Sequence, residues 1–207
     1  INGQLSMLTA EYCCSVFLQV IEAYHTSNDV DEAFPFQDVE HDIHHFLKLK
    51  SWIDTVQWHL EDIIRKPDLP PDEFIHTKRR IDLSNQERTD LVEKIDDWFS
   101  NQFAHVTLVE NPRINTETPA WVIDRLSILM LKIYHMQEQT LRTDVDEKHT
   151  AVCKSKLEIL LEQKADLCFS LNALIQEIGE GKTRMKTYRQ MKMYNDPATN
   201  PELYNKR

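Results

Sequence analysis

The chain has 207 residues, of which 41% are hydrophobic and 28% charged, and only three are glycine. This composition is typical of a folded globular protein, and the scarcity of glycine favours helices over sheets with many turns. The formal net charge of −10 argues against binding to DNA, RNA or an anionic membrane surface, because such binding needs a basic protein face. The uncharged runs near the start are ten residues long, too short to cross a bilayer.

The four cysteines include one adjacent pair and no C-x-x-C pair. This pattern indicates buried thiols in a reducing compartment, not a disulfide framework. Since no signal-peptide pattern is visible, we expect a soluble cytoplasmic protein.

Apolar side chains recur at helical spacing along five segments, which predicts an all-α fold. The expected helices span residues 5–24, 38–65, 71–99, 119–134 and 147–178. Thr118 and Pro119 are good start signals for the fourth helix, and Gly179 and Gly181 are good stop signals for the fifth. An extended piece is expected at 104–109. We therefore predict an antiparallel bundle of about five to six helices in a single domain, residues 1–207.

A shift of 76 residues aligns WHLED, residues 58–62, with YHMQE, residues 134–138, without a gap. One interpretation is a duplicated helical hairpin, with copies at 50–100 and 126–178. The other is that any two amphipathic hairpins match this well by chance. His59 and His135 correspond under the shift, which makes them the preferred histidines for a pocket.

Carboxylates on the second and third expected helices are candidates for a metal site. Glu61 lies on a polar stripe of the second helix with Asp62 beside it, and Glu93 and Asp96 form an E-x-x-D pair on a stripe of the third. If the stripes face each other, these groups would hold Mg²⁺ or Mn²⁺. The alternative is two solvated faces with ordinary ion pairs along each helix.

Several polar residues occupy positions where packing alone would place hydrocarbons. Asn85 and Arg88 interrupt the apolar stripe of the third helix, and Asp124 and Arg125 lie in the otherwise apolar fourth helix. A buried charge is costly without a partner, so Arg88 is expected to meet either Asp124 or an anionic ligand.

The segment GKTRMKTYRQMKMY, residues 181–194, contains five basic residues and no acidic one. It could form one wall of an anion pocket, or it could pair with the protein's own acidic helices. With these residues the candidate ligand-binding set is His59, Arg65, Asn85, Arg88, Asp124, Arg125, His135, Lys186 and Arg189.

Four stretches of the sequence resemble a bacterial family, the domain of unknown function numbered 4254, and are most similar to members of the Bacteroides group. They are WIDTVQWHLEDIIR, KRRIDLSNQERTDLVEKID, NTETPAWVIDRLSILMLKIYH and YRQMKMYNDP. The resemblance implies a helical intracellular bacterial protein but supplies no reaction. It also implies proximity to genes for surface polysaccharide synthesis, commonly glycosyltransferases.

Two functions fit these observations. The first is binding or hydrolysis of a phosphorylated ligand, a nucleotide or nucleotide sugar, with Mg²⁺ or Mn²⁺ held by the four carboxylates and phosphate held by Arg88, Lys186 and Arg189. The alternative is a non-enzymatic interaction or regulatory protein for glycan assembly, with a glycosyltransferase partner or as a homodimer. The first is preferred because functional sites are where sequence rules are expected to fail.

Overall fold

The structure, a computed structural model, describes residues 8–37, 39 and 42–204. Within them the chain forms α2 (Ala10–Tyr24), α3 (Ile43–Ile63), α4 (Pro71–Gln102), β1 (Arg113–Ile114), α5 (Pro119–Leu141), α6 (Glu147–Gly179), β2 (Thr183–Arg184) and α7 (Pro201–Tyr204). The prediction of an all-α fold is confirmed. In the described part of the chain, no helix is both long and apolar enough to span a membrane.

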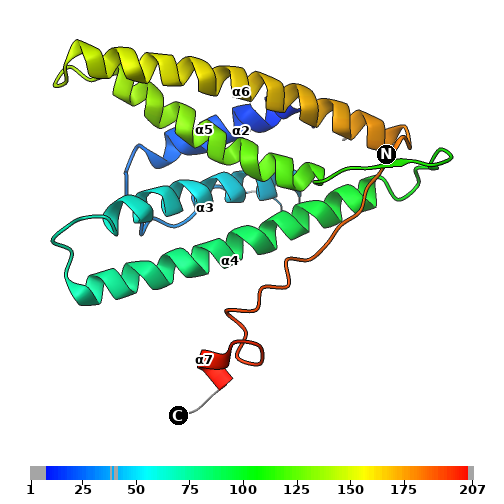
Figure 1. The fold of residues 1–207 in the computed structure, drawn as a ribbon, viewed down its shortest axis with the longest axis horizontal. Coiled ribbons are helices and arrows are strands. Elements are labelled where there is room, and N and C mark those ends of the chain that lie inside the picture. Colours follow the sequence, from blue (N-terminus) through cyan, green and yellow to red (C-terminus); the bar gives the residue numbers. More distant parts are fainter. Residues whose placement is uncertain (1–7, 38, 40–41, 205–207) are drawn as a thin grey trace.

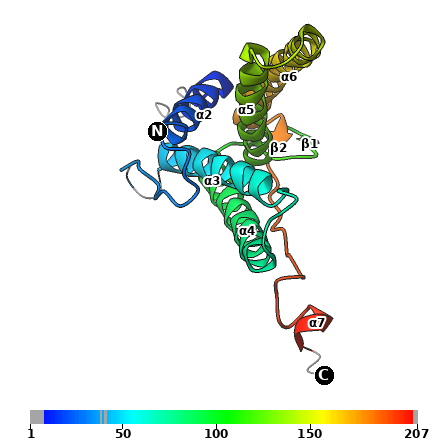
Figure 2. The same cartoon turned by 90° about the vertical axis from the view of Figure 1, so that its left-hand side faces the viewer.

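The helices are arranged as two antiparallel hairpins, α3–α4 and α5–α6, which lie in separate layers (Figure 1). The loops that close the two hairpins lie at the same end of the molecule. α2 packs beside the hairpins and contacts α3, α5 and α6 (Figure 2). The two hairpins coincide with the ranges of the suggested repeat, 50–100 and 126–178, whose common origin stays a prediction.

One continuous core joins α2 to both hairpins. Its fully buried side chains come from every long helix and include Phe17, Leu47, Ile95, Phe99, Ile123, Leu126 and Leu171. α5 lies at its centre, as its apolar sequence indicated, whereas α6 packs chiefly against α5 and leaves its outer side exposed. All four cysteines are buried free thiols.

Helix boundaries follow the capping residues more closely than the apolar pattern. α2 begins at Ala10 because the side chain of Thr9 accepts a hydrogen bond from Tyr12 N, whereas a start at residue 5 was expected. Positions 5–7, 38, 40 and 41 of the expected helices lie outside the described residues. Thr118 caps α5 as predicted, by accepting a hydrogen bond from Trp121 N at 3.4 Å.

The expected extended piece at 104–109 is wrong, because the short parallel strand pair instead joins Arg113–Ile114 to Thr183–Arg184. A strand needs a partner, and the partner in this region is the segment that follows Gly181. There the carbonyl groups of Gly181 and Lys182 accept hydrogen bonds from Val109 N and Arg113 N. These bonds hold the connector between α4 and α5 against the end of α6.

We predict that Gly181→Ala destabilises the protein by about 2 kcal/mol or more. Gly181 has φ of +71°, and an added Cβ would lie 2.2 Å from the carbonyl oxygen of Thr107. Urea unfolding followed by circular dichroism would measure the change. Gly179→Ala is the matched control, because its Cβ would meet only the Phe103 ring at 3.6 Å. Equal stabilities of the two variants would contradict the prediction.

Candidate functional site

A buried ion cluster joins the two hairpins. Lys50 of α3 is fully buried, and its ammonium pairs with Asp54 one turn later and with Asp124 of α5, 3.0 Å away. Ser127 Oγ donates a hydrogen bond to Asp54 at 2.6 Å. Ammonium and carboxylate groups in such a dry position must be paired, so the cluster fixes how α3 lies on α5.

The polar residues that interrupt the apolar stripes have different partners in the structure. The sequence correctly suggested that Arg88 meets Asp124, and the Nε of Arg88 lies 3.9 Å from Asp124 Oδ1. The Asn85 side chain accepts a hydrogen bond from Gln57 Nε2. Arg125 points outward and pairs with Glu117 on the surface, so it does not join the cluster.

Two adjoining hollows lie beside this cluster. Trp58 and Asp62 line both, and Asp54 of the cluster lines the second. The first has a volume of about 540 Å³, and its lining residues are Trp58, Asp62, Lys132, His135, Met136, Gln139, Lys156, Ile159 and Leu160. The second has a volume of about 340 Å³, and its lining residues are Asp54, Gln57, Trp58, Glu61, Asp62, Arg65, Arg88, Ile128 and Leu131. Polar candidates from both hairpins therefore meet at these hollows.

The four carboxylates proposed as metal ligands do not come together. Glu61 and Asp62 line the hollows, but Glu93 accepts a hydrogen bond from Gln190 N of the C-terminal segment. Asp96 is 2% exposed, and its burial raises its pKa to about 6. Among the described residues, no group of three or more acidic side chains has its oxygens close enough for one ion. The two acidic stripes thus face different neighbours.

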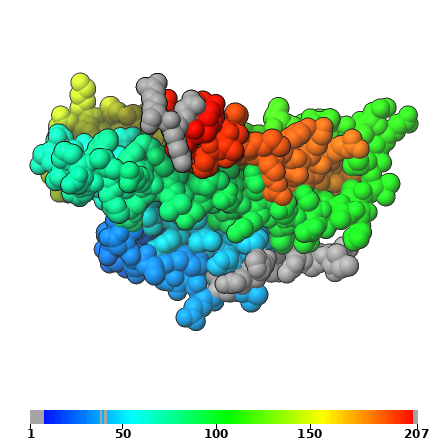
Figure 3. All heavy atoms as spheres, turned by 90° about the horizontal axis from the view of Figure 1, so that it is seen from below, coloured from blue at the N-terminus to red at the C-terminus, as the bar shows by residue number. Residues whose placement is uncertain are grey.

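The basic C-terminal segment pairs with the protein's own acidic helix. It leaves β2 and lies against α4 (Figure 3). Arg189 binds Asp97 and Glu93, and Lys192 Nζ donates to the carbonyl of Asn85. Lys186 lies over the Tyr188 ring. Neither Lys186 nor Arg189 lines the two hollows, so the alternative of an anion pocket wall is not realised.

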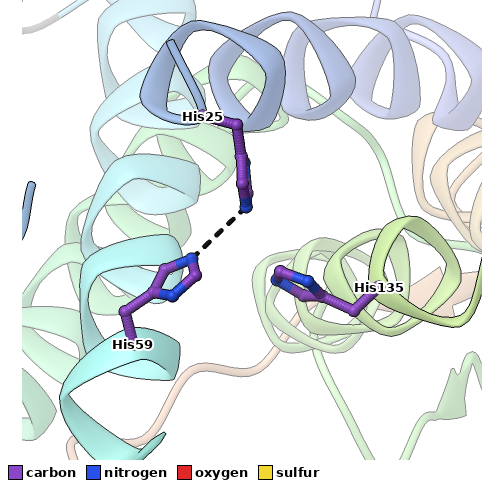
Figure 4. Close-up of side chains that lie close together, drawn as sticks. All are labelled: His25, His59 and His135. Atoms are coloured by element: carbon purple, nitrogen blue, oxygen red, sulfur yellow. Dashed lines mark hydrogen bonds between the residues drawn. The ribbon is translucent and has the colours of Figure 1, made fainter. Parts of the chain in front are cut away.

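Three histidines from three helices meet beside the first hollow. His25 caps the end of α2, His59 lies in α3 and His135 lies in α5. Their rings point toward one another (Figure 4), and one ring nitrogen of each lies within 4.8 Å of the others. The rings of His59 and His135 stack on Tyr24 and Trp58 respectively. The structure thus brings together the two histidines that the repeat had singled out.

Burial lowers the pKa of both His25 and His59, each of which also lies beside another histidine. Nδ1 of His25 donates a hydrogen bond to the carbonyl of Ile21 at 2.6 Å, and Nδ1 of His135 donates to Glu138 at 2.7 Å. The nitrogen of each of these two rings that is not used in these hydrogen bonds is Nε2.

Sequence reasoning missed Lys50 and His25. A signal for Lys50 was present in the sequence, because Lys50 lies one turn before Asp54 on the same side of α3 and the two side chains can form an ion pair. No local signal marked His25, because its importance arises from where α2 ends relative to α3 and α5.

We predict that Lys50→Met lowers the free energy of unfolding by about 3–5 kcal/mol, because it leaves two buried carboxylates without their cation. Urea unfolding at neutral pH would measure the loss. Lys66→Met, at an exposed position, is the control and should be nearly neutral. A wild-type midpoint for Lys50→Met would contradict the role given to the cluster.

We predict that Asp96→Asn becomes more stable relative to wild type as pH rises from 4 to 8. The Asp96 pKa is about 6 in the fold and 3.8 ordinarily, so the folded carboxyl holds its proton more tightly. Wild type therefore loses stability as pH rises from about 4 to 6, by at most about 3 kcal/mol, and the asparagine variant does not. Urea unfolding across this range would test it, with exposed Asp90→Asn as control. Parallel pH curves for wild type and Asp96→Asn would refute it.

Comparison with known proteins identifies a family but no characterised relative. No curated protein and no solved structure matches this chain. The model of the family described as "Protein of unknown function (DUF4254)" matches residues 44–187, which include His59 and His135 but not His25. The match covers more than half of the chain, so the protein belongs to the DUF4254 family.

Proposed function

We propose that this protein binds a phosphorylated small molecule, a nucleotide or a nucleotide sugar, in the two adjoining hollows. The observation that carries the proposal is a pair of lysines, Lys132 of α5 and Lys156 of α6, that line the first hollow. Among the described residues neither lysine has a carboxylate within 4.0 Å. Unpaired cations at a concave surface favour an anionic ligand.

The second hollow, which Trp58 also lines, adds two cations. Arg88 lies 3.9 Å from the Asp124 carboxylate, and Arg65 pairs with Glu61 on its own helix. Arginine binds phosphate in a two-pronged geometry, and both arginines line this hollow. The net charge of −10 argues against a basic surface over the whole protein. The cations that line the two hollows are therefore a local exception to the acidic surface.

Aromatic side chains supply a place for the organic part of such a ligand. Trp58 and His135 both line the first hollow, together with Met136, Ile159 and Leu160. Small-molecule sites commonly have volumes of about 300–1,000 Å³, mostly apolar walls and a few polar groups, and the first hollow fits this description. The resemblance to a family near polysaccharide genes favours nucleotide sugars in surface polysaccharide metabolism. A divalent metal would assist by neutralising phosphate charge.

A second candidate is a non-enzymatic interaction protein, favoured by exposed apolar side chains of α6, one of which, Ile159, also lines the first hollow. Four of its apolar side chains are exposed: Val152, Ile159, Leu161 and Phe169. Exposed charges of both signs lie along the same helix, among them Glu147, Lys148, Lys154, Lys156, Glu158, Glu162 and Asp166. A self-complementary contact can join apolar side chains and charges of both signs, so the partner that we propose is a second copy of this chain. Regulation of a glycosyltransferase in glycan assembly would then act through this dimer.

A thermal-shift screen with nucleotides and nucleotide sugars, each with and without divalent metals, tests the binding proposal. A ligand at about 100 times its dissociation constant adds roughly 2.7 kcal/mol. For a chain of this length the melting temperature should rise by about 5–10 °C. The double variant Lys132→Ala, Lys156→Ala should abolish the rise, whereas exposed Lys154→Ala should keep it.

A flat screen, or a shift that survives loss of both lysines, would overturn the binding proposal. A flat screen together with a dimer in analytical ultracentrifugation would favour the interaction protein instead.

A further inference from the structure

We propose that the Nε2 atoms of His25, His59 and His135 form a binding site for a transition-metal ion, with Zn²⁺ as its occupant. These three histidines and Zn²⁺ differ from the carboxylates and Mg²⁺ that the sequence suggested. Imidazole nitrogen suits zinc, whereas magnesium prefers oxygen. What the ion does for a phosphorylated ligand rests on the proposed function, but its binding does not.

The spacing of the ring nitrogens fits tetrahedral coordination. Nε2 of His25 and Nε2 of His59 are 3.3 Å apart. Two nitrogens bound to one zinc ion at about 2.0–2.1 Å in a tetrahedron lie roughly 3.3 Å apart. A ring nitrogen of His135 lies within 4.8 Å of both.

The hydrogen bonds of the rings direct the correct nitrogen inward. Nδ1 of His25 donates to the Ile21 carbonyl and Nδ1 of His135 donates to the Glu138 carboxylate, which leaves both Nε2 lone pairs available. Nδ1 of His59 lies 4.0 Å from Asp62, the carboxylate that would take this role for the third ring. Metal-binding histidines usually donate their second N–H to such a carbonyl or carboxylate.

One of these nitrogens is costly without a ligand. Nε2 of His135 is buried, and no hydrogen-bond partner lies within its reach among the described residues. A buried polar atom normally has a partner, and a metal ion would supply it.

The surroundings hold the three rings in place and leave room for a further ligand. The ligands come from α2, α3 and α5, which one core fixes, and aromatic rings stack on His59 and His135. All three histidines are half-buried, so solvent reaches the site. Three protein ligands leave a fourth position open, as in catalytic zinc sites. Because His135 also lines the first hollow, the ion would lie beside the proposed ligand site.

The test uses the full chain without a polyhistidine tag, freed of metal with a chelator and titrated with zinc chloride by isothermal calorimetry. We expect one zinc per chain. Zinc-edge X-ray absorption of the wild-type complex should show three imidazole nitrogens at about 2.0 Å. His59→Ala and His135→Gln should each weaken binding by more than about 100-fold, and Glu138→Gln by about 10–100-fold. His76→Ala, at an exposed position of α4, should bind as wild type does.

Circular dichroism of each variant separates loss of binding from loss of folding, and the X-ray absorption measurement needs no variant. Absence of stoichiometric zinc binding to wild type, fewer than three imidazole ligands, or unchanged affinity in folded His59→Ala would overturn the proposal. Zinc binding without any response to phosphorylated ligands would support the metal site and contradict the proposed function. A response to phosphorylated ligands without zinc binding would contradict only the metal site.

Discussion

The arrangement of this protein depends on burying one lysine. Lys50 has no route to solvent, so its charge must be balanced by Asp54 on its own helix and Asp124 on the other hairpin. Apolar contacts alone would allow α3 to slide or rotate on α5 at small cost, but an ammonium between two buried carboxylates tolerates little displacement. The two hairpins thus have one favoured register. Arg88 of α4, which lies near Asp124, extends the ion cluster toward the surface.

That register places the residues of both candidate sites. Trp58 and His59 lie one turn or more beyond Asp54 on α3, and His135 lies further along α5 from Asp124, so both helices carry them to the same end of the molecule. α2 ends there as well and contributes His25. The hollows form where the hairpins meet beyond the packed core, with Asp54 and Arg88 lining the second hollow.

Charge is divided between two surfaces with different partners. The C-terminal segment places Arg189 on Glu93 and Asp97, so much of its positive charge neutralises α4. Lys132 of α5 and Lys156 of α6 instead line the first hollow, without a carboxylate partner among the described residues. A net charge of −10 is therefore compatible with the anion site that we propose, because the lysines of that site are local.

The sequence by itself determined the helices, because period and capping are local properties. The apolar spacing predicted five long helices, Thr118 and Pro119 marked the start of α5, and Gly179 and Gly181 marked the end of α6. It also identified His59, His135 and Arg88 as unusual. Only the tertiary structure decided which of these meet. The separation of Glu93 and Asp96 from Glu61 and Asp62, and the arrival of His25 beside His59, depend on how helices rotate and cross. Those angles are set by packing between distant segments and by the buried charges of Lys50, Asp54 and Asp124. A local sequence pattern contains no information about such contacts.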